Sequence, residues 1–158
     1  MHKIQLLYFF SYGCPACARF DPDFEKWVNT HKNKKITIRK FPVAFKDERV
    51  NLAKLYYVMN ALDPKEALND KIFKDIHDKD LQLWQIPIMK QFFIDAEYNA
   101  DDFEKTIDSF GVNLEVKNAE ELSEDYTINQ TPTIIINGFT NIYKLNRDKN
   151  DANNFEKI

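Results

Sequence analysis

The chain has 158 residues, with 22 basic against 25 acidic side chains and a net charge of −3 at pH 7. This length favours one domain, or one domain with a sub-domain inserted in it. The mild acidity argues against a nucleic-acid surface, which is usually rich in Lys and Arg. Three Gly leave no room for a glycine-rich phosphate loop. Two Cys cannot form a disulfide scaffold, and with three scattered His they do not readily complete a four-ligand zinc site.

The first 45 residues predict a strand, a helix and a second strand. Ile4–Phe10 is a short aromatic and aliphatic run that ends in a turn sequence, as a buried strand does. A helical stripe of large apolar side chains follows from Cys14, and Ile36–Phe45 alternates like a strand. Strand, helix and strand within about 40 residues indicate a βαβ unit with two parallel strands.

The middle of the chain predicts a run of helices without a strand. Each expected helix begins near a capping residue or a proline, and apolar residues recur at helical spacing within it. The expected helices cover Asp47–Leu62, a segment from Pro64 to about Asp78, a segment that starts at Pro87, a segment capped by Asp101, and Leu114–Tyr126. We therefore expect residues 47–110 to form an all-α insertion.

The last third returns to strand signals. Thr133–Ile136 is the strongest β-branched run in the chain, and Asn137-Gly138 after it is typical of a hairpin turn before a strand in Phe139–Leu145. These signals predict an α/β fold class, with the strands in residues 1–46 and 111–158 and the all-α helical insertion in 47–110.

Cys14-Pro15-Ala16-Cys17 is the feature that carries chemistry. It lies where the first strand ends and a helix begins, so Cys14 is expected at the N-cap and Pro15 at the first helical position. The free N–H groups and the dipole of the helix start favour a thiolate at Cys14, which is the species that attacks disulfides. Half of a zinc site and a structural disulfide remain as alternatives, although closing so short a loop stabilises a fold very little.

The sequence resembles the DsbA family of thiol–disulfide oxidoreductases, which have the thioredoxin fold. The resemblance covers nearly the whole chain in the same order, including the helical insertion. The matching segments are FFSYGCPAC at residues 9–17, KFPVAF at 40–45, YVMNALD at 57–63, FIDAEYNADDFEKTIDSF at 93–110 and QTPTIIINGFTNI at 130–142.

This resemblance implies a role for each residue of the site. Cys14 is expected to be the exposed nucleophile and Cys17 its partner, with Pro15 and Ala16 between them tuning the pair. The resemblance also implies that Pro132 is a cis-proline beside the cysteines and that the backbone of Thr131 pairs with an extended substrate segment.

The resemblance further implies oxidation of dithiols in exported proteins through the redox-active Cys14–Cys17 disulfide, without an organic cofactor or a metal. It implies a periplasmic or otherwise extracytoplasmic location, a monomer, and a membrane protein of the DsbB type as reoxidant. The sequence itself does not exclude the cytoplasm. A disulfide reductase or isomerase with the same residues is the first alternative, and a non-enzymatic module that binds polypeptides is the second.

Two positions depart from the best-known family members. Ala16 stands where those members have a His that stabilises the thiolate, so we expect a weaker oxidant. Tyr8 stands where a buried Glu is often found, so no carboxylate is expected at that position. Trp84, between a polar segment and Pro87, is interpreted either as a packing residue or as part of an exposed patch.

Overall fold

A computed structural model describes residues 4–32, 35–136 and 142–144 of the chain. Its sheet has four strands in the order β2-β1-β3-β4. The central strand β1 is parallel to β2 and antiparallel to β3, and β3 is antiparallel to β4. The strands are β1 (Ile4–Phe10), β2 (Ile36–Pro42), β3 (Thr133–Ile136) and β4 (Ile142–Lys144).

The predicted βαβ unit is confirmed. Strand β1 has the predicted bounds, helix α1 (Pro15–Thr30) follows it, and Ile4 to Phe10 pair in parallel with Ile36 to Pro42. Strand β2 ends at Pro42, three residues before the predicted end, and Val43 still donates its N–H to the carbonyl of Phe10. Helix α1 continues through Pro22.

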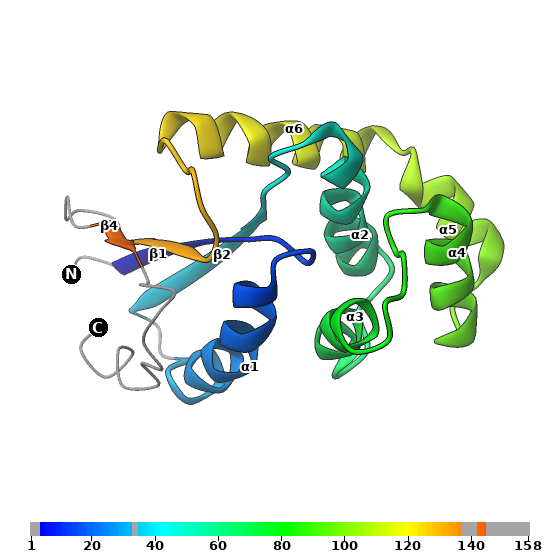
Figure 1. Cartoon of the computed structure of the whole chain (residues 1–158), viewed down its shortest axis with the longest axis horizontal. Helices are drawn as coiled ribbons and strands as arrows, with labels where there is room; N and C mark the ends of the chain where they lie inside the picture. Colours follow the sequence, from blue (N-terminus) through cyan, green and yellow to red (C-terminus); the bar gives the residue numbers. More distant parts are fainter. Residues whose placement is uncertain (1–3, 33–34, 137–141, 145–158) are drawn as a thin grey trace.

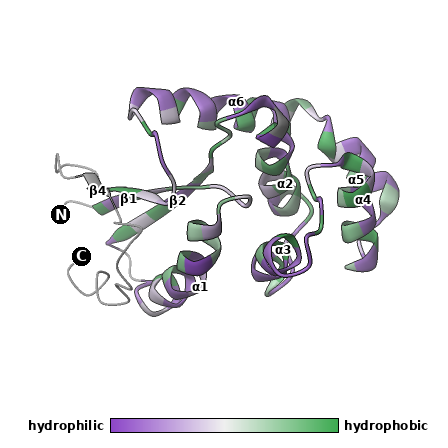
Figure 2. Ribbon diagram, in the orientation of Figure 1, coloured by the Kyte–Doolittle hydropathy of each residue, from purple (hydrophilic) through white to green (hydrophobic). Residues whose placement is uncertain are grey.

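Two helices cover the two faces of the sheet (Figure 1), with α1 on one face and α6 (Phe110–Asp125) on the other. The α1 face buries the side chains of Leu6, Tyr8 and Phe10 from β1, whereas Leu7 and Phe9 lie in a smaller cluster on the α6 face. This alternation follows from the period of two along a strand. The outer sides of α1 and α6 are largely hydrophilic (Figure 2).

The remaining helices lie beyond one end of the sheet and next to the loop that joins β1 to α1 (Figure 1). A short 3-10 helix, η1 (Asp47–Arg49), leads into them. They are α2 (Val50–Ala61), α3 (Leu68–His77), α4 (Ile86–Asp95) and α5 (Ala100–Ile107). The predicted run of helices between the two groups of strands is therefore present. We retain the division into residues 1–46 with 111–158 and residues 47–110 as a proposal.

Several predicted helix starts are wrong by a few residues. Asp47 begins the 3-10 helix rather than capping α2, and the segment after Pro64 becomes helical only at Leu68. Helix α5 is capped by Asn99 instead of Asp101, since the Asn99 side chain accepts a hydrogen bond from the backbone N–H of Asp102. Helix α6 begins at Phe110, four residues before its predicted start, because Ser109 caps it through the N–H of Val112.

The predicted strand pair at the end of the sheet is present as β3 and β4, with Ile135 opposite Ile142. The Asn137-Gly138 turn expected between them lies outside the described residues.

Candidate active site

Cys14 lies at the junction of β1 and α1. It is the N-cap of α1 in an extended conformation, with φ −90° and ψ 118°, and Pro15 occupies the first turn. The N–H of Cys14 donates to the carbonyl of Ser11 at 3.1 Å, and its own carbonyl accepts from the N–H of Ala18 at 3.1 Å. The sequence-based prediction for the start of α1 is confirmed in both residues. A cysteine sulfur is thereby placed at the end of a helix where backbone N–H groups lack partners.

The environment of the Cys14 sulfur favours its ionised form. The side chain is 9% exposed. The neighbouring thiol of Cys17 donates to the Cys14 sulfur and is the largest influence, which burial partly opposes. The Thr131 side chain and the backbone N–H groups of Cys17 and Ala16 add to the lowering, and the pKa of Cys14 falls from 9.0 to about 5. The Cys17 thiol and the backbone N–H groups of the first turn thus stabilise the Cys14 thiolate, although the Ala16 side chain cannot donate a hydrogen bond.

Cys17 lies one turn further along α1 and has the opposite character. Its side chain is fully buried, with 0% exposure. Burial, the hydrogen bond with Cys14 and the negative charge of the Cys14 thiolate all raise the pKa of Cys17 far above its ordinary value. Both cysteines are free thiols. The expectation that Cys14 is exposed is wrong for this structure, since both cysteines are buried. A thiolate with a small exposed area therefore lies beside a fully hidden thiol that keeps its proton.

The segment before β3 lies next to Cys14, although it is more than a hundred residues away in the sequence. The Cys14 sulfur is 3.5 Å from the carbonyl oxygen of Thr131. The Thr131–Pro132 peptide bond is cis, as the family resemblance implies. Thr131 is buried, and Thr133 is held in place by a hydrogen bond from its hydroxyl to the carbonyl of Gln130 at 2.7 Å. The structure thus brings Cys14, Pro15, Ala16, Cys17, Thr131 and Pro132 to one corner of the molecule.

A buried polar network that the sequence did not predict lies beneath this corner. The Tyr8 hydroxyl donates to one carboxylate oxygen of Asp21 at 3.2 Å, and the Asn69 amide donates to the other at 2.8 Å. The Tyr12 hydroxyl completes the chain by donating to the Asn69 amide oxygen at 2.7 Å. Asp21 is one turn beyond Cys17 in α1, and that spacing is the only sequence signal that points to it. The signal is weak, because a lone Asp in a helix is usually exposed.

The network displaces the pKa of each of its ionisable groups. Burial is the largest cause for Asp21 and raises its pKa, although the positive charge of Lys40 and the hydrogen bonds from Tyr8 and Asn69 partly oppose the rise. Burial also raises the pKa of Tyr8, and the charges of Asp21 and Cys17 raise it further. The raised pKa keeps the Tyr8 hydroxyl protonated, as the hydrogen bond that it donates to Asp21 requires.

A second wall of the corner comes from α3. The ring nitrogen Nε2 of His77 is 2.7 Å from the carbonyl oxygen of Tyr12 and donates to it, which ties α3 to the loop before Cys14. No sequence pattern connects these two residues, which are 65 positions apart.

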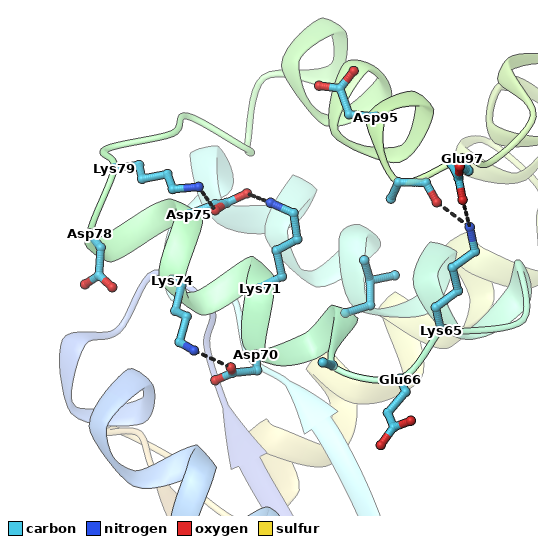
Figure 3. A pocket seen from close by; sticks show the side chains of 13 residues that line it. Lys65, Glu66, Asp70, Lys71, Lys74, Asp75, Asp78, Lys79, Asp95 and Glu97 are labelled. Atoms are coloured by element: carbon cyan, nitrogen blue, oxygen red, sulfur yellow. Dashed lines mark hydrogen bonds and ion pairs between the residues drawn. The ribbon is translucent and has the colours of Figure 1, made fainter.

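A charged hollow on the outer side of α3 is a different kind of surface (Figure 3). Lys71 and Lys79 both pair with Asp75, at 2.5 and 3.0 Å, and Lys74 pairs with Asp70 at 2.8 Å. Each of these ammonium groups already has a carboxylate partner. The hollow therefore offers no unpaired cluster for catalysis.

The described residues contain neither a metal-ligand cluster nor a helix that could span a membrane. No group of three or more potential metal ligands is found in this part of the chain. Within the same residues, no helix combines the length and the hydrophobicity that crossing a membrane requires.

Known proteins match this chain both in sequence and in fold. A family model described as thioredoxin matches residues 3–154. The chain is 33% identical over 136 residues to the thiol:disulfide interchange protein DsbA of Burkholderia cepacia and 32% identical to that of Bordetella pertussis. Each match covers 86% of this chain and 64% of the relative, so the chain spans less than two thirds of those proteins.

Two solved structures are similar in fold. The reduced DsbA1 of Neisseria meningitidis has a TM-score of 0.72 and 26% identity, over 85% of this chain and 71% of that one. The DsbA of Pseudomonas aeruginosa has a TM-score of 0.80 over 86% of this chain and 70% of that one. Its identity of 22% bears on the fold alone.

Proposed function

Since this chain belongs to the thioredoxin family and groups there with the DsbA proteins, we propose that it is a thiol-disulfide oxidoreductase. The favoured reaction is oxidation of dithiols in exported proteins, with Cys14 and Cys17 as the reacting pair. The observation that carries the proposal is the placement of Cys14 at the N-cap of α1, with its sulfur 3.5 Å from the carbonyl oxygen of Thr131 and the buried Cys17 one turn further on. The low pKa of Cys14, about 5, and the raised pKa of Cys17 agree with it.

The reaction begins with the Cys14–Cys17 disulfide. A substrate thiolate attacks the Cys14 sulfur, the bond between Cys14 and Cys17 breaks, and Cys17 leaves with the electron pair and takes up a proton. A second substrate thiolate then attacks the substrate sulfur of the mixed disulfide. Cys14 leaves as a thiolate, the substrate has lost two electrons and two protons, and the protein holds the two electrons on its sulfurs.

The two pKa values give the two cysteines different roles in this reaction. A thiolate with a low pKa is a good leaving group, so Cys14 releases the oxidised substrate readily. The high pKa of Cys17 favours its protonation once it has been displaced, which discourages it from attacking the mixed disulfide again. Both effects stabilise the dithiol form, and a protein whose dithiol form is stable is an oxidant.

The remaining residues are proposed to bind and to tune. The backbone of Thr131 is proposed to pair with an extended segment of the substrate, since its carbonyl already lies 3.5 Å from the Cys14 sulfur. Pro132 holds the turn at this point, Pro15 starts the helix, and Ala16 leaves the thiolate to the helix N–H groups. The redox-active disulfide needs no organic cofactor or metal for these steps.

The setting of the reaction is proposed from the same family grouping. We propose an extracytoplasmic, periplasmic location, action as a monomer, protein substrates that carry Cys, and a membrane reoxidant of the DsbB type that returns Cys14 and Cys17 to the disulfide. A reductase or isomerase with the same cysteines is the competing function, and it differs in the potential of the pair rather than in its residues.

Substitution of Cys14 by Ser tests the proposal. The disulfide form of the protein is mixed with a reduced dithiol peptide, and peptide oxidation is followed by mass spectrometry. We expect wild-type turnover in the presence of a small disulfide oxidant, and at least a 100-fold loss in Cys14→Ser with the fold intact by circular dichroism. Unchanged oxidation in that variant would contradict the role of Cys14. Wild-type peptide binding without any thiol exchange would favour the polypeptide-binding module.

A further inference from the structure

A hollow of about 320 Å³ adjoins the reactive cysteine on the side of the helical segment. Both chain neighbours of Cys14, Gly13 and Pro15, line it. The opposite walls come from η1, α2, α3 and the connection between α3 and α4, which lie around the loop after β1 (Figure 1). A polypeptide that brings a cysteine to the Cys14 sulfur therefore has its adjoining residues close to this opening.

The walls combine apolar surface with one exposed aromatic ring. Leu52 and Ile76 are buried core residues that present part of their side chains to the hollow. Trp84 also lines the hollow, yet it is 38% exposed, which is high for so large an apolar side chain. An exposed Trp in a concave site is typical of a contact surface, because its ring offers a large area with few rotatable bonds.

The guanidinium of Arg49 lies across the face of Gly13. A Cβ atom at position 13 would stand 2.8 Å from Arg49 Nη1 and 3.2 Å from Leu52 Cδ1. A larger residue at position 13 would therefore displace the Arg49 guanidinium from its place against the backbone next to Cys14. Within the described residues Arg49 has no carboxylate partner, and neither does Asp80, which also lines the hollow.

Hydrogen bonds hold the walls in place. His77 is tied to the carbonyl oxygen of Tyr12 at 2.7 Å, and the Asn51 amide donates to the carbonyl of Trp84 at 2.9 Å. Leu83, the residue before Trp84, is fully buried and anchors the α3–α4 connection. The hollow is thus largely formed before anything enters it, which lowers the entropic cost of binding.

The charges of the lining select among occupants. Arg49 and Asp80 carry opposite charges, so a charged side chain that approaches one of them also meets its own sign on the other. An aromatic ring suits the lining better, because a guanidinium stacks on aromatic faces and an indole packs against their edges. The volume lies at the lower end of the roughly 300–1,000 Å³ range of ligand pockets, which fits one side chain rather than an organic cofactor.

We propose that this hollow is a specificity pocket, which receives an aromatic side chain of the substrate polypeptide close to its reacting cysteine. The proposal rests on the proposed function and adds a preference among its substrates. Trp84 and Arg49 are its binding residues, and Gly13 is the position that keeps the pocket open beside Cys14.

Matched peptides test the pocket. Two-cysteine peptides are made that differ at one position, which carries Phe, Ser or Asp and is placed one or two residues before or after the reacting cysteine. The measured quantity is the ratio of kcat/KM for the Phe peptide to that for the Ser peptide, with the disulfide form of the full chain as oxidant. For wild type we expect a ratio of about five or more at one placement at least.

Three variants distinguish binding in the pocket from a general preference of the protein for apolar peptides. Trp84→Ala and Arg49→Gln are each expected to bring the ratio close to one. Phe110→Ala, a substitution of the 83% exposed Phe110 at the start of α6, is the matched control and is expected to keep the wild-type ratio. A ratio close to one in wild type at every placement would overturn the pocket, as would a preference that survives in both Trp84→Ala and Arg49→Gln.

The outcomes also separate this inference from the proposed function. Faster oxidation of the Asp peptide than of the Phe peptide would overturn the aromatic occupant while leaving the oxidoreductase activity in place. Absence of turnover with all of the peptides, in a protein that is folded and fully in its disulfide form, would instead overturn the activity and the pocket together.

Discussion

Two aspartates, Asp21 in α1 and Asp75 in α3, are almost equally hidden from water, with 3% and 4% exposure. Their surroundings are nevertheless opposite in kind. Burial raises the pKa of a carboxyl group, and in Asp75 this tendency is outweighed by hydrogen bonds and charge from Lys71 and Lys79, which leave its pKa below the ordinary value. In the charged hollow of Figure 3 these ammonium groups reach the carboxylate directly.

In Asp21 the balance goes the other way. Tyr8 and Asn69 donate hydrogen bonds to it, but Lys40 acts only at a distance while its own ammonium group pairs with Glu25. Burial therefore dominates, and the pKa of Asp21 rises. The two sites show that an ion pair at contact distance restores an ordinary charged carboxylate, whereas neutral donors leave a group poised to change its protonation state.

The two cysteines differ from the charged hollow on α3 in the same way, because within the described residues they have no oppositely charged side chain as a partner. Both thiol pKa values are displaced at the start of α1. Backbone N–H groups and the neighbouring Cys17 thiol stabilise the Cys14 thiolate there in place of a positively charged side chain. The two cysteine pKa values are thus displaced without an ion pair, whereas Asp70 and Asp75 of α3 are held in ion pairs with Lys71, Lys74 and Lys79.

The largest expected effect concerns the reactivity of the two thiols. In the dithiol form at pH 7, Cys14 is expected to react with iodoacetamide roughly 100-fold faster than Cys17, because only Cys14 is ionised and only Cys14 retains some exposure, 9% against 0%. The rate at Cys14 should have its midpoint near pH 5. Cys17→Ala should move that midpoint upward, since it removes the largest stabilising contact. Peptide mapping after timed alkylation measures both, and a midpoint near 9 in wild type would refute the assignment.

The next largest effect concerns the influence of residue 16 on the Cys14 pKa and on the reduction potential of the pair. Ala16→His adds a cationic side chain beside the thiolate, which should lower the pKa of Cys14 further and make the pair more oxidising. Each unit of pKa corresponds to about 1.36 kcal/mol, and therefore to about 30 mV for two electrons. Equilibration with glutathione measures the shift. Ala16→Gln is a control that adds bulk without charge, and an equal shift in both variants would argue against the electrostatic cause.

Asp21, buried beneath the corner that holds the two cysteines, should change the stability of the protein with pH, because it has no ion pair at contact distance with any described residue. A raised pKa in the folded state means that wild type loses stability as pH rises from about 4 through the pKa of Asp21. Asp21→Asn removes this loss, so the variant should gain on wild type between pH 4 and pH 8, by an amount on the order of 1 kcal/mol. Urea unfolding across that range measures the difference, and a difference that is constant with pH would contradict the raised pKa.

The same substitution on α3 is the matched control and should give the smallest effect with the opposite slope. The lowered pKa of Asp75 contributes stability above about pH 4, and this contribution is lost as pH falls through that pKa. Asp75→Asn should therefore cost about 0.5 kcal/mol at pH 7, less at pH 3 and less in 1 M salt. If both aspartates gave the same pH slope, the comparison between the two regions would fail.

The sequence predicted the frame of the site well, for local reasons. The positions of Cys14 and Pro15 follow from strand and helix signals in neighbouring residues, and the βαβ unit follows from the same signals. The Asp21 network, the contact of His77 with Tyr12 and the approach of Arg49 to Gly13 were not predicted. Each joins residues that are far apart in the chain, so only tertiary packing brings them together.

The errors at helix starts have a similar origin. Asn99 and Asp101 are both good capping residues, and the choice between them depends on the direction from which the chain enters α5. The early start of α6 at Phe110 leaves a large ring 83% exposed. An apolar periodicity placed this start at Leu114, because the pattern assumes that apolar residues are buried.

The reduction potential of the Cys14–Cys17 pair tests the central claim most directly. Equilibration of wild type with mixtures of reduced and oxidised glutathione, followed by acid quenching and mass spectrometry, measures it. We expect a value between that of thioredoxin, about −270 mV, and that of DsbA, about −120 mV. The Cys17 thiol and the backbone N–H groups of the helix start stabilise the Cys14 thiolate, whereas the Ala16 side chain offers no donor. A potential at or below that of thioredoxin, about −270 mV, would contradict oxidation as the function and favour the reductase.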